Sequence, residues 1–109
     1  MILAIIEMTV LPAKRKEFLQ TIHGLVQSFR KEKGCIKCSA YHDIEDENTI
    51  CMIEGWETQK ELDSYLQSDL FEVLLGTKNF LSGPWEINFN TVSSTTRFET
   101  VKKARGKTS

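Results

Sequence analysis

The 109-residue sequence predicts a single α+β domain in which strands and helices follow the order βαββαβ. Three observations lead to this prediction. Four short segments are rich in apolar and β-branched residues, as strands are, and two longer segments repeat apolar residues at steps of three and four, as helices do. Two neighbouring strand segments are joined only by a short acidic turn, which indicates an antiparallel hairpin. The length is that of one domain whose core leaves much of the surface in water.

The first strand and helix occupy the first third of the chain. Residues 2–10 are apolar on both faces, which indicates a strand that is covered on both sides. A helix of about five turns is predicted after Pro12, and Gly34 suits a left-handed end to it. The apolar stripe that predicts this helix consists of Phe18, Leu19, Ile22, Leu25, Val26 and Phe29.

The middle of the chain is predicted to form the antiparallel hairpin. Residues 35–43 and 49–57 are its two strands, joined by an acidic turn of about five residues. We expect Asp43 to pair with Thr49 across this turn.

The second half of the chain supplies another helical stretch and the last strand. Thr58 and Glu61 form a capping box, in which the threonine oxygen accepts a backbone N–H and the glutamate reaches back. Ser68 resembles a second cap within the stretch, which a Gly-Pro pair ends. Residues 85–92 alternate as a fourth strand. The complete order is that of a ferredoxin-like fold with a four-stranded antiparallel sheet.

The C-terminal segment differs from the rest of the chain in charge. We expect the domain to span residues 1–93 and a basic, flexible tail to span residues 94–109. Residues 97–109 hold five of the 14 basic residues and one of the 15 acidic ones, so their net charge is +4 and the remainder carries −5. Such a segment either frays into solvent or contacts an acidic surface, and Phe98 and Val101 are apolar enough to dock on a partner.

The composition predicts a cytoplasmic protein that binds neither membranes nor nucleic acid. No apolar run approaches the ~20 residues that span a bilayer, and the first ten residues read as a strand and not as a signal peptide. The three cysteines are expected to remain thiols. The acidic body has no aromatic RNA-binding motif.

The sheet is expected to bring two copies of the chain together. In a βαββαβ domain both helical layers cover the same face of the sheet. Both faces of the first strand are largely apolar, so the face that the helices leave bare is not polar there, nor clearly so on the third strand. Two sheets that pack these faces against each other would bury them, so the sequence predicts a homodimer.

Two carboxylates stand out because they lie within apolar strands. Glu7 and Glu54 are expected to be buried, and a buried carboxylate needs a hydrogen-bond partner or a raised pKa. Either Glu54 is a catalytic base, or it accepts hydrogen bonds from a helix end or an indole N–H and stabilises the fold. Glu7 is a structural residue or a part of the substrate-binding site.

Aromatic residues and one histidine complete the candidate site. Tyr65, on a short helix at the open end of the sheet, is the preferred catalytic residue because its hydroxyl needs a polar partner. Trp56 and Phe71 are candidate walls of a pocket for a flat aromatic substrate, unless they are core residues. His42 is a candidate general base, or else a partly exposed hairpin residue.

Metal and redox sites are not expected. Cys35 and Cys38 form a C-x-x-C motif, but residues three apart in a strand point to opposite faces, so the two sulfurs should lie apart. In the expected hairpin register Cys51 faces away from Cys38 and His42. No set of three or four metal ligands forms in this arrangement.

The order and spacing of several motifs over residues 2–92 resemble the antibiotic biosynthesis monooxygenase (ABM) family. The resemblance implies a dimeric α/β barrel. It also implies monooxygenase activity on a small aromatic quinol or polyketide without any cofactor, because a deprotonated electron-rich ring reacts with O₂ itself. The protein supplies a base, a dry pocket and polar groups for the anion. The motifs are Leu11-Pro12-Ala13-Lys14 with Phe18, the Lys33-Gly34-Cys35 turn, the strand Ile53-Glu54-Gly55-Trp56-Glu57, and Leu62-x-x-Tyr65-Leu66-x-Ser68 followed by Phe71.

The sequence departs from the family pattern at positions that matter for the reaction. Many members have histidines where this chain has Tyr65 and Leu70, and haem-degrading relatives have an axial histidine near positions 74–75. Haem degradation is therefore disfavoured. The chain is either a monooxygenase in which Tyr65, His42 or Glu54 handles the proton, or a non-catalytic small-ligand-binding or stress-response module on the same fold.

Overall fold

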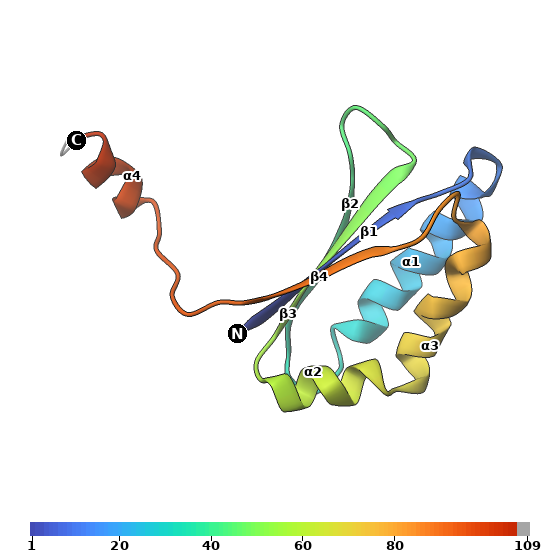
Figure 1. Cartoon of the computed structure of the whole chain (residues 1–109), viewed down its shortest axis with the longest axis horizontal. Helices are drawn as coiled ribbons and strands as arrows, with labels where there is room; N and C mark the ends of the chain where they lie inside the picture. The colour runs from blue at the N-terminus through green and yellow to red at the C-terminus, as the bar shows by residue number, and fades with distance from the viewer. Residues whose placement is uncertain (107–109) are drawn as a thin grey trace.

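The computed structural model describes residues 1–106 and has the predicted βαββαβ core (Figure 1). None of the helices within these residues is long and apolar enough to cross a membrane. The elements in chain order are β1 (Ile2–Thr9), the 3₁₀ helix η1 (Pro12–Lys14), α1 (Arg15–Phe29), β2 (Cys35–His42), β3 (Thr49–Trp56), α2 (Gln59–Leu66), α3 (Asp69–Leu75), the 3₁₀ helix η2 (Gly76–Phe80), β4 (Glu86–Thr91) and α4 (Glu99–Ala104).

The four strands form one antiparallel sheet in the order β2-β3-β1-β4. The predicted hairpin register is confirmed, because the Asp43 N–H donates to the Thr49 carbonyl at 2.9 Å and Tyr41 lies opposite Cys51. Figure 1 shows α1, α2 and α3 on one side of this sheet. The predicted fold class, a ferredoxin-like α+β domain, is therefore confirmed.

Local signals set the ends of the helices. The Thr58 hydroxyl accepts from the Glu61 N–H, and the Ser68 hydroxyl accepts from the Phe71 N–H, each at 3.2 Å, so both hydroxyl caps are present. The returning bond of the predicted capping box is not formed, because the buried Glu61 Oε2 has no hydrogen-bond partner within the described residues. Gly34 has the predicted left-handed conformation with φ of +85°, although α1 ends earlier, at Phe29. A Cβ at position 34 would overlap the Glu61 side chain, so only glycine fits this connection between α1 and β2.

The core lies between the sheet and the layer of α1, α2 and α3. Every second residue of β1 faces this layer and is buried, and each such apolar side chain contributes roughly 1.5–3 kcal/mol to folding. The predicted stripe on α1 is also confirmed, except that Leu19 is only partly buried. The buried core side chains of these two elements are Ile2, Ala4, Ile6 and Met8, and Phe18, Ile22, Leu25, Val26 and Phe29.

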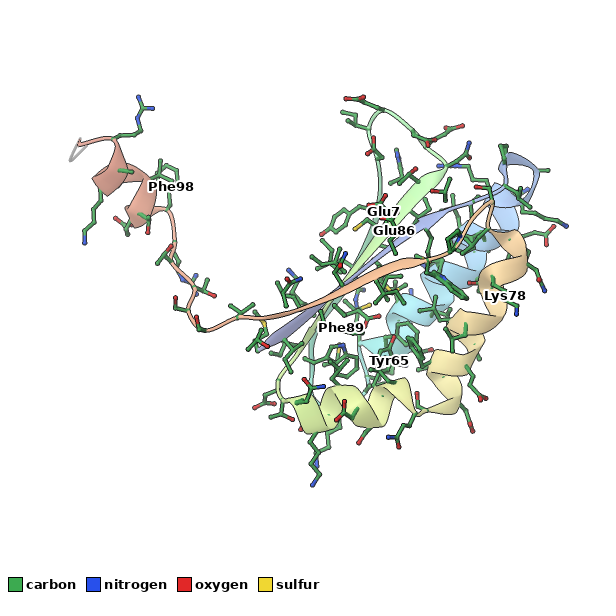
Figure 2. All side chains as sticks on the ribbon, in the orientation of Figure 1. Glu7, Tyr65, Lys78, Glu86, Phe89 and Phe98 are labelled. Carbon is green, nitrogen blue, oxygen red and sulfur yellow. The ribbon has the colours of Figure 1, made fainter. Side chains whose placement is uncertain are left out.

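The opposite face of the sheet has no helix against it within the described residues. Leu3, Ile5 and Ile53 are partly exposed there. Glu7 and Glu86 are cross-strand neighbours on the same face, and both are exposed (Figure 2). The expected burial of Glu7 is therefore wrong, because the sheet side to which it points is covered by nothing in a single copy of the chain.

The chain leaves the domain after β4. The Val92 N–H donates to the Met1 carbonyl at 2.9 Å, and the following residues then run away from the sheet (Figure 1). Helix α4, which the sequence pattern did not indicate, lies apart from the domain. Residues 107–109 of the predicted flexible tail lie outside the described residues.

Candidate functional site

A buried polar cluster lies between β3 and α2. Glu54 is fully buried, and its carboxylate accepts hydrogen bonds from the Tyr65 hydroxyl at 2.8 Å and from the Trp56 indole N–H at 3.1 Å. Glu54 and Trp56 are two residues apart in a strand and share a face, which makes the second bond possible. The expected bond from an indole to Glu54 is thus confirmed, and the polar partner of Tyr65 is Glu54.

Aromatic rings enclose Tyr65. Its ring stacks on Trp56 with centroids 4.3 Å apart, and it meets Phe29 and Phe71 edge to face at 5.0 and 5.2 Å. Edge-to-face and offset contacts at these distances are favourable beyond the area they bury. These rings also belong to the hydrophobic core, because none of the side chains of Trp56, Tyr65 and Phe71 is more than 8% exposed.

Burial shapes the acid–base chemistry of this cluster. It raises the pKa of the Glu54 carboxyl above its ordinary value of about 4.5, and the two hydrogen bonds offset part of that effect. Burial and the Glu54 charge raise the pKa of Tyr65 well above its ordinary value. Tyr65 therefore stays protonated, and its hydroxyl donates a hydrogen bond to Glu54. Glu54 is the member of the pair that can accept a proton from another group.

A small pocket connects Tyr65 to the surface. It has a volume of about 350 Å³ beside α2, and Tyr65 is its aromatic lining residue. The other lining residues are polar or charged: Glu32, Lys33, Thr58, Lys60, Glu61 and Ser64.

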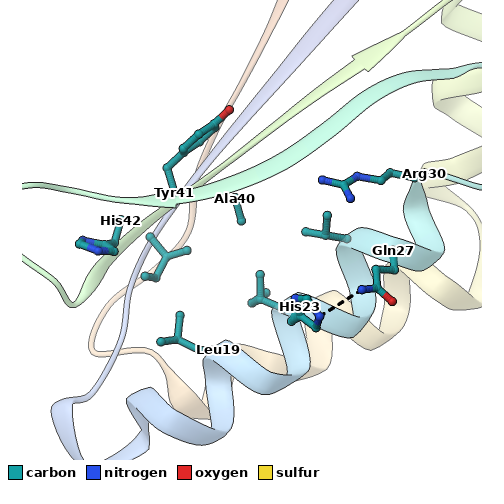
Figure 3. A pocket seen from close by; sticks show the side chains of 10 residues that line it. Leu19, His23, Gln27, Arg30, Ala40, Tyr41 and His42 are labelled. Atoms are coloured by element: carbon teal, nitrogen blue, oxygen red, sulfur yellow. Dashed lines mark hydrogen bonds between the residues drawn. The ribbon is translucent and has the colours of Figure 1, made fainter.

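A larger pocket of about 560 Å³ lies between α1 and the edge strand β2 (Figure 3). Half of its lining is apolar and half is polar, and the two kinds come from both elements. The apolar residues are Leu19, Ile22, Val26, Ala40 and Ile50, and the polar or aromatic ones are His23, Gln27, Arg30, Tyr41 and His42.

Hydrogen bonds define the proton positions on the two histidines of this pocket. His42 Nδ1 lies 3.0 Å from the Asp43 carbonyl oxygen. A carbonyl only accepts, so Nδ1 carries the proton and Nε2 of the neutral ring is an acceptor. His23 Nε2 accepts from the Gln27 amide at 3.0 Å, since that amide nitrogen only donates. His42 is thus the histidine whose acceptor nitrogen is free of a hydrogen bond within residues 1–106.

Arg30 is a cation at the end of the pocket opposite His42. Arg30 donates its Nε–H to the Cys38 carbonyl at 2.8 Å, which ties the end of α1 to β2. Arg30 and His42 lie toward opposite ends of the pocket in Figure 3, with His23 on α1 between them. The pocket can therefore hold a flat apolar molecule with a proton acceptor at one end and a positive charge at the other.

The predicted site residues fall in three separate places. Glu54, Trp56, Tyr65 and Phe71 come together in the core, His42 lies in the larger pocket, and Glu7 points to the opposite side of the sheet. The polar lining that α1 contributes to the larger pocket was not predicted from the sequence. His23, Gln27 and Arg30 are spaced by four and three residues beside the apolar stripe, and this spacing is the signal that would have revealed them.

The expectation that Cys35 and Cys38 face opposite sides of the sheet is wrong. Cys35 pairs with Trp56 and Cys38 pairs with Glu54, so both face the helices, because a β-bulge adds one residue between them. Burial raises the pKa of the Cys38 thiol to about 12 and also raises that of Cys35. Both are free thiols, and neither is activated as a nucleophile.

A four-stranded antiparallel sheet with one helical layer defines a ferredoxin-like α+β domain (Figure 1). The family model of antibiotic biosynthesis monooxygenase matches residues 1–74, and the chain belongs to this ABM family. YcnE of Bacillus subtilis, whose name proposes a monooxygenase activity, is 30% identical over 72% of this chain and 83% of its own length.

Two further proteins are similar to this chain. An uncharacterized protein of Synechocystis is 30% identical over 79% of this chain, which spans only 59% of that relative. The crystal structure of a conserved protein from Methanosarcina mazei superposes with a TM-score of 0.77 at 30% identity, over 82% of this chain and 89% of that one. Family membership supports a general monooxygenase-like function.

Proposed function

We propose that the protein is a cofactor-independent monooxygenase of a small aromatic quinol or polyketide-like phenol and that it works as a cytoplasmic homodimer. The pocket between α1 and β2 is the proposed substrate site. Its volume of about 560 Å³ lies within the range of small-molecule sites, and its apolar walls suit a flat ring. The observation that carries the proposal is the acceptor nitrogen of His42 in this pocket.

The proposed reaction begins with proton transfer. His42 Nε2 accepts the proton of a substrate hydroxyl, and the protonated ring stays beside the phenolate oxygen. Arg30, at the other end of the pocket (Figure 3), stabilises the negative charge that the aromatic ring carries to its far side. The electron-rich ring carbon then donates electrons to O₂. In an anthrone this carbon is a CH₂ group: one oxygen atom replaces its hydrogen atoms as a carbonyl, and the other leaves with them as water. In a hydroquinone the ring carbon supplies one hydrogen atom of the water and a hydroxyl group supplies the other. The apolar walls exclude bulk water from the anion.

Tyr65 and Glu54 are the second candidate for the proton-handling group. Glu54 has a raised pKa, and Tyr65 lies between it and the smaller pocket, so a substrate there would pass its proton to Glu54 through the Tyr65 hydroxyl. Trp56 and Phe71 would support the Tyr65 ring from within the core and would not line this alternative site. Glu7 lies on the opposite face of the sheet and would not contact a substrate in either pocket.

Oxygen uptake by metal-stripped protein, measured against a panel of hydroquinones and anthrones, tests the proposal. Heat-denatured protein provides the autoxidation background. We expect uptake above background that is lost in His42→Ala and retained in Tyr65→Phe. The reverse pattern would assign the chemistry to the Tyr65–Glu54 pair. Tight binding of a panel compound without turnover would support the alternative, a non-catalytic small-ligand-binding module.

The proposed homodimer rests on the uncovered face of the sheet. Leu3, Ile5 and Ile53 form an apolar strip there, which a second sheet would bury. Sedimentation at micromolar concentration should give the mass of two chains, and a monomer would contradict this part of the proposal.

A further inference from the structure

We propose that the C-terminal arm, residues 92–106, docks on the acidic turn, residues 43–47, of a second copy of the chain. The proposal rests on the proposed homodimer and is independent of the proposed reaction. It assigns a partner to two exposed segments of the molecule.

The arm has the properties of a segment that needs a partner. Helix α4 has six residues and lies apart from the domain, and helices shorter than ~12–15 residues are marginal alone in water. Phe98 and Val101, one turn apart, are 66% and 45% exposed. Figure 2 shows Phe98 far from the sheet. The basic residues around this apolar pair are Arg97, Lys102, Lys103 and Arg105.

The acidic turn is complementary to the arm. Four of its five residues are acidic, and the fifth, Ile44, is 97% exposed. The Asp43 and Asp46 carboxylates accept hydrogen bonds from backbone N–H groups of the turn and hold its shape. Glu45 and Glu47 are exposed beside Ile44. An apolar centre with negative neighbours thus matches an apolar pair with positive ones.

The sheet register places the two segments at opposite ends of one copy. Strand β4 ends at Thr91 opposite Ile2, whereas the acidic turn precedes Thr49, which lies opposite Thr9. The eight residues of β1 between these ends span roughly 25 Å. Residues 92–98 leave the sheet in the direction away from the turn (Figure 1), so docking on the turn of the same copy would require the arm to reverse its direction along the length of the sheet.

A second copy removes this difficulty. When two copies are related by a two-fold axis, each arm can reach the acidic turn of the other, so that both contacts form at once and the assembly closes as a dimer. The net charge of +4 on residues 97–109 and of −5 on the rest of the chain favours this exchange.

Zero-length carbodiimide cross-linking of a mixture of ¹⁴N- and ¹⁵N-labelled full-length chains, refolded together, tests the contact directly. We expect mixed-isotope peptides that join Lys102 or Lys103 to Glu45, Asp46 or Glu47. Cross-links of these lysines only within one isotope, or only to carboxylates elsewhere, would overturn the proposal. Both outcomes are independent of oxygen uptake, so this test and that of the proposed function fail separately.

Charge reversal provides the second test. The arm variant K102E/K103E/R105E and the turn variant E45K/E47K should each weaken the dimer by about tenfold, and their combination should restore it to within about threefold. The control K31E/K60E reverses two exposed lysines of the body and should leave the dimer unchanged. If the combined variant is no better than either alone, or if the arm variant instead loses binding to a nucleic acid or to anionic vesicles with no change in the dimer, the arm has another partner.

Discussion

The cluster around Glu54 and the pocket beside His42 lie on the same side of the sheet, but they differ in the burial and hydrogen bonding of their polar groups. In the cluster, Glu54 is fully buried and receives two hydrogen bonds from rings that are themselves core residues. In the pocket, His42 is exposed and only one of its nitrogens is bonded. Polar groups thus contribute to stability in one region and are available for chemistry in the other.

The difference follows from the layer above each region. Tyr65 on α2 and Phe71 at the start of α3 belong to the layer that covers Glu54. The Glu54 carboxylate must therefore find its hydrogen-bond donors within the protein. Strand β2 is an edge strand, and α1 leaves space beside it. Variants in the cluster should therefore change stability first, and variants in the pocket should change activity first.

The largest effect on stability is expected for Trp56→Ala. The change removes a fully buried indole, its stacking on Tyr65 and one hydrogen bond to Glu54, and should lower the free energy of unfolding by about 3–5 kcal/mol. Urea unfolding measures this. The matched control is Tyr41→Ala, an aromatic residue of the pocket that is 58% exposed, which should change stability by less than about 0.5 kcal/mol.

The largest effect on activity is expected for His42→Ala. Loss of a general base should lower the rate of oxygen uptake by about 100-fold or more, with stability unchanged within about 0.5 kcal/mol. His23→Ala is the control, since its acceptor nitrogen is already bonded to Gln27, and it should retain most of the rate. Equal losses in both variants would mean that the pocket needs its shape and not the His42 base.

An intermediate effect is expected for Tyr65→Phe. The ring and its packing stay, but one oxygen of Glu54 loses its donor inside the core, which should cost about 1–3 kcal/mol of stability. Turnover per folded molecule should change less than twofold. A loss of turnover that exceeds the loss of folded protein would contradict the contrast between the two regions.

The smallest effect is expected from the titration of Glu54. Its pKa is raised in the folded state, so the folded protein holds this proton more tightly than the unfolded chain does. Stability should accordingly fall as the pH rises from the ordinary value of about 4.5 through the raised value, and should stay constant above it. Urea unfolding across this range should show the fall in the wild type and not in Glu54→Gln. A parallel pH dependence in both would mean that Glu54 does not titrate there.

Much of the fold could be predicted because local signals agree with each other. Thr58 and Ser68 cap helices as their neighbours in sequence indicate, and the acidic turn fixes the hairpin register. The bond between Trp56 and Glu54 was predictable for the same reason, since the alternation of a strand puts both on one face. These features depend on residues close together in sequence.

The features that could not be predicted depend on contacts between segments that are distant in the sequence. Glu7 sits among apolar residues, and its exposure follows only from the absence of cover on one side of the sheet in residues 1–106. The partners of His42 in the pocket come from α1, and the polar residues of that helix look like an ordinary solvated flank until β2 is placed beside them. Sequence alone therefore predicted the buried cluster better than the pocket.

The bulge at the start of β2 has a consequence for how the sequence can vary. Ile36 is the inserted residue, and its side chain is half exposed. Exchanging it for another residue would leave the pairing intact. Deleting it would make the pairing regular and would leave Cys35, then two residues from Cys38, on the helix side of the sheet. Related chains should therefore differ at this position both in the identity of the residue and in its presence, while the side chains before and after it keep their faces.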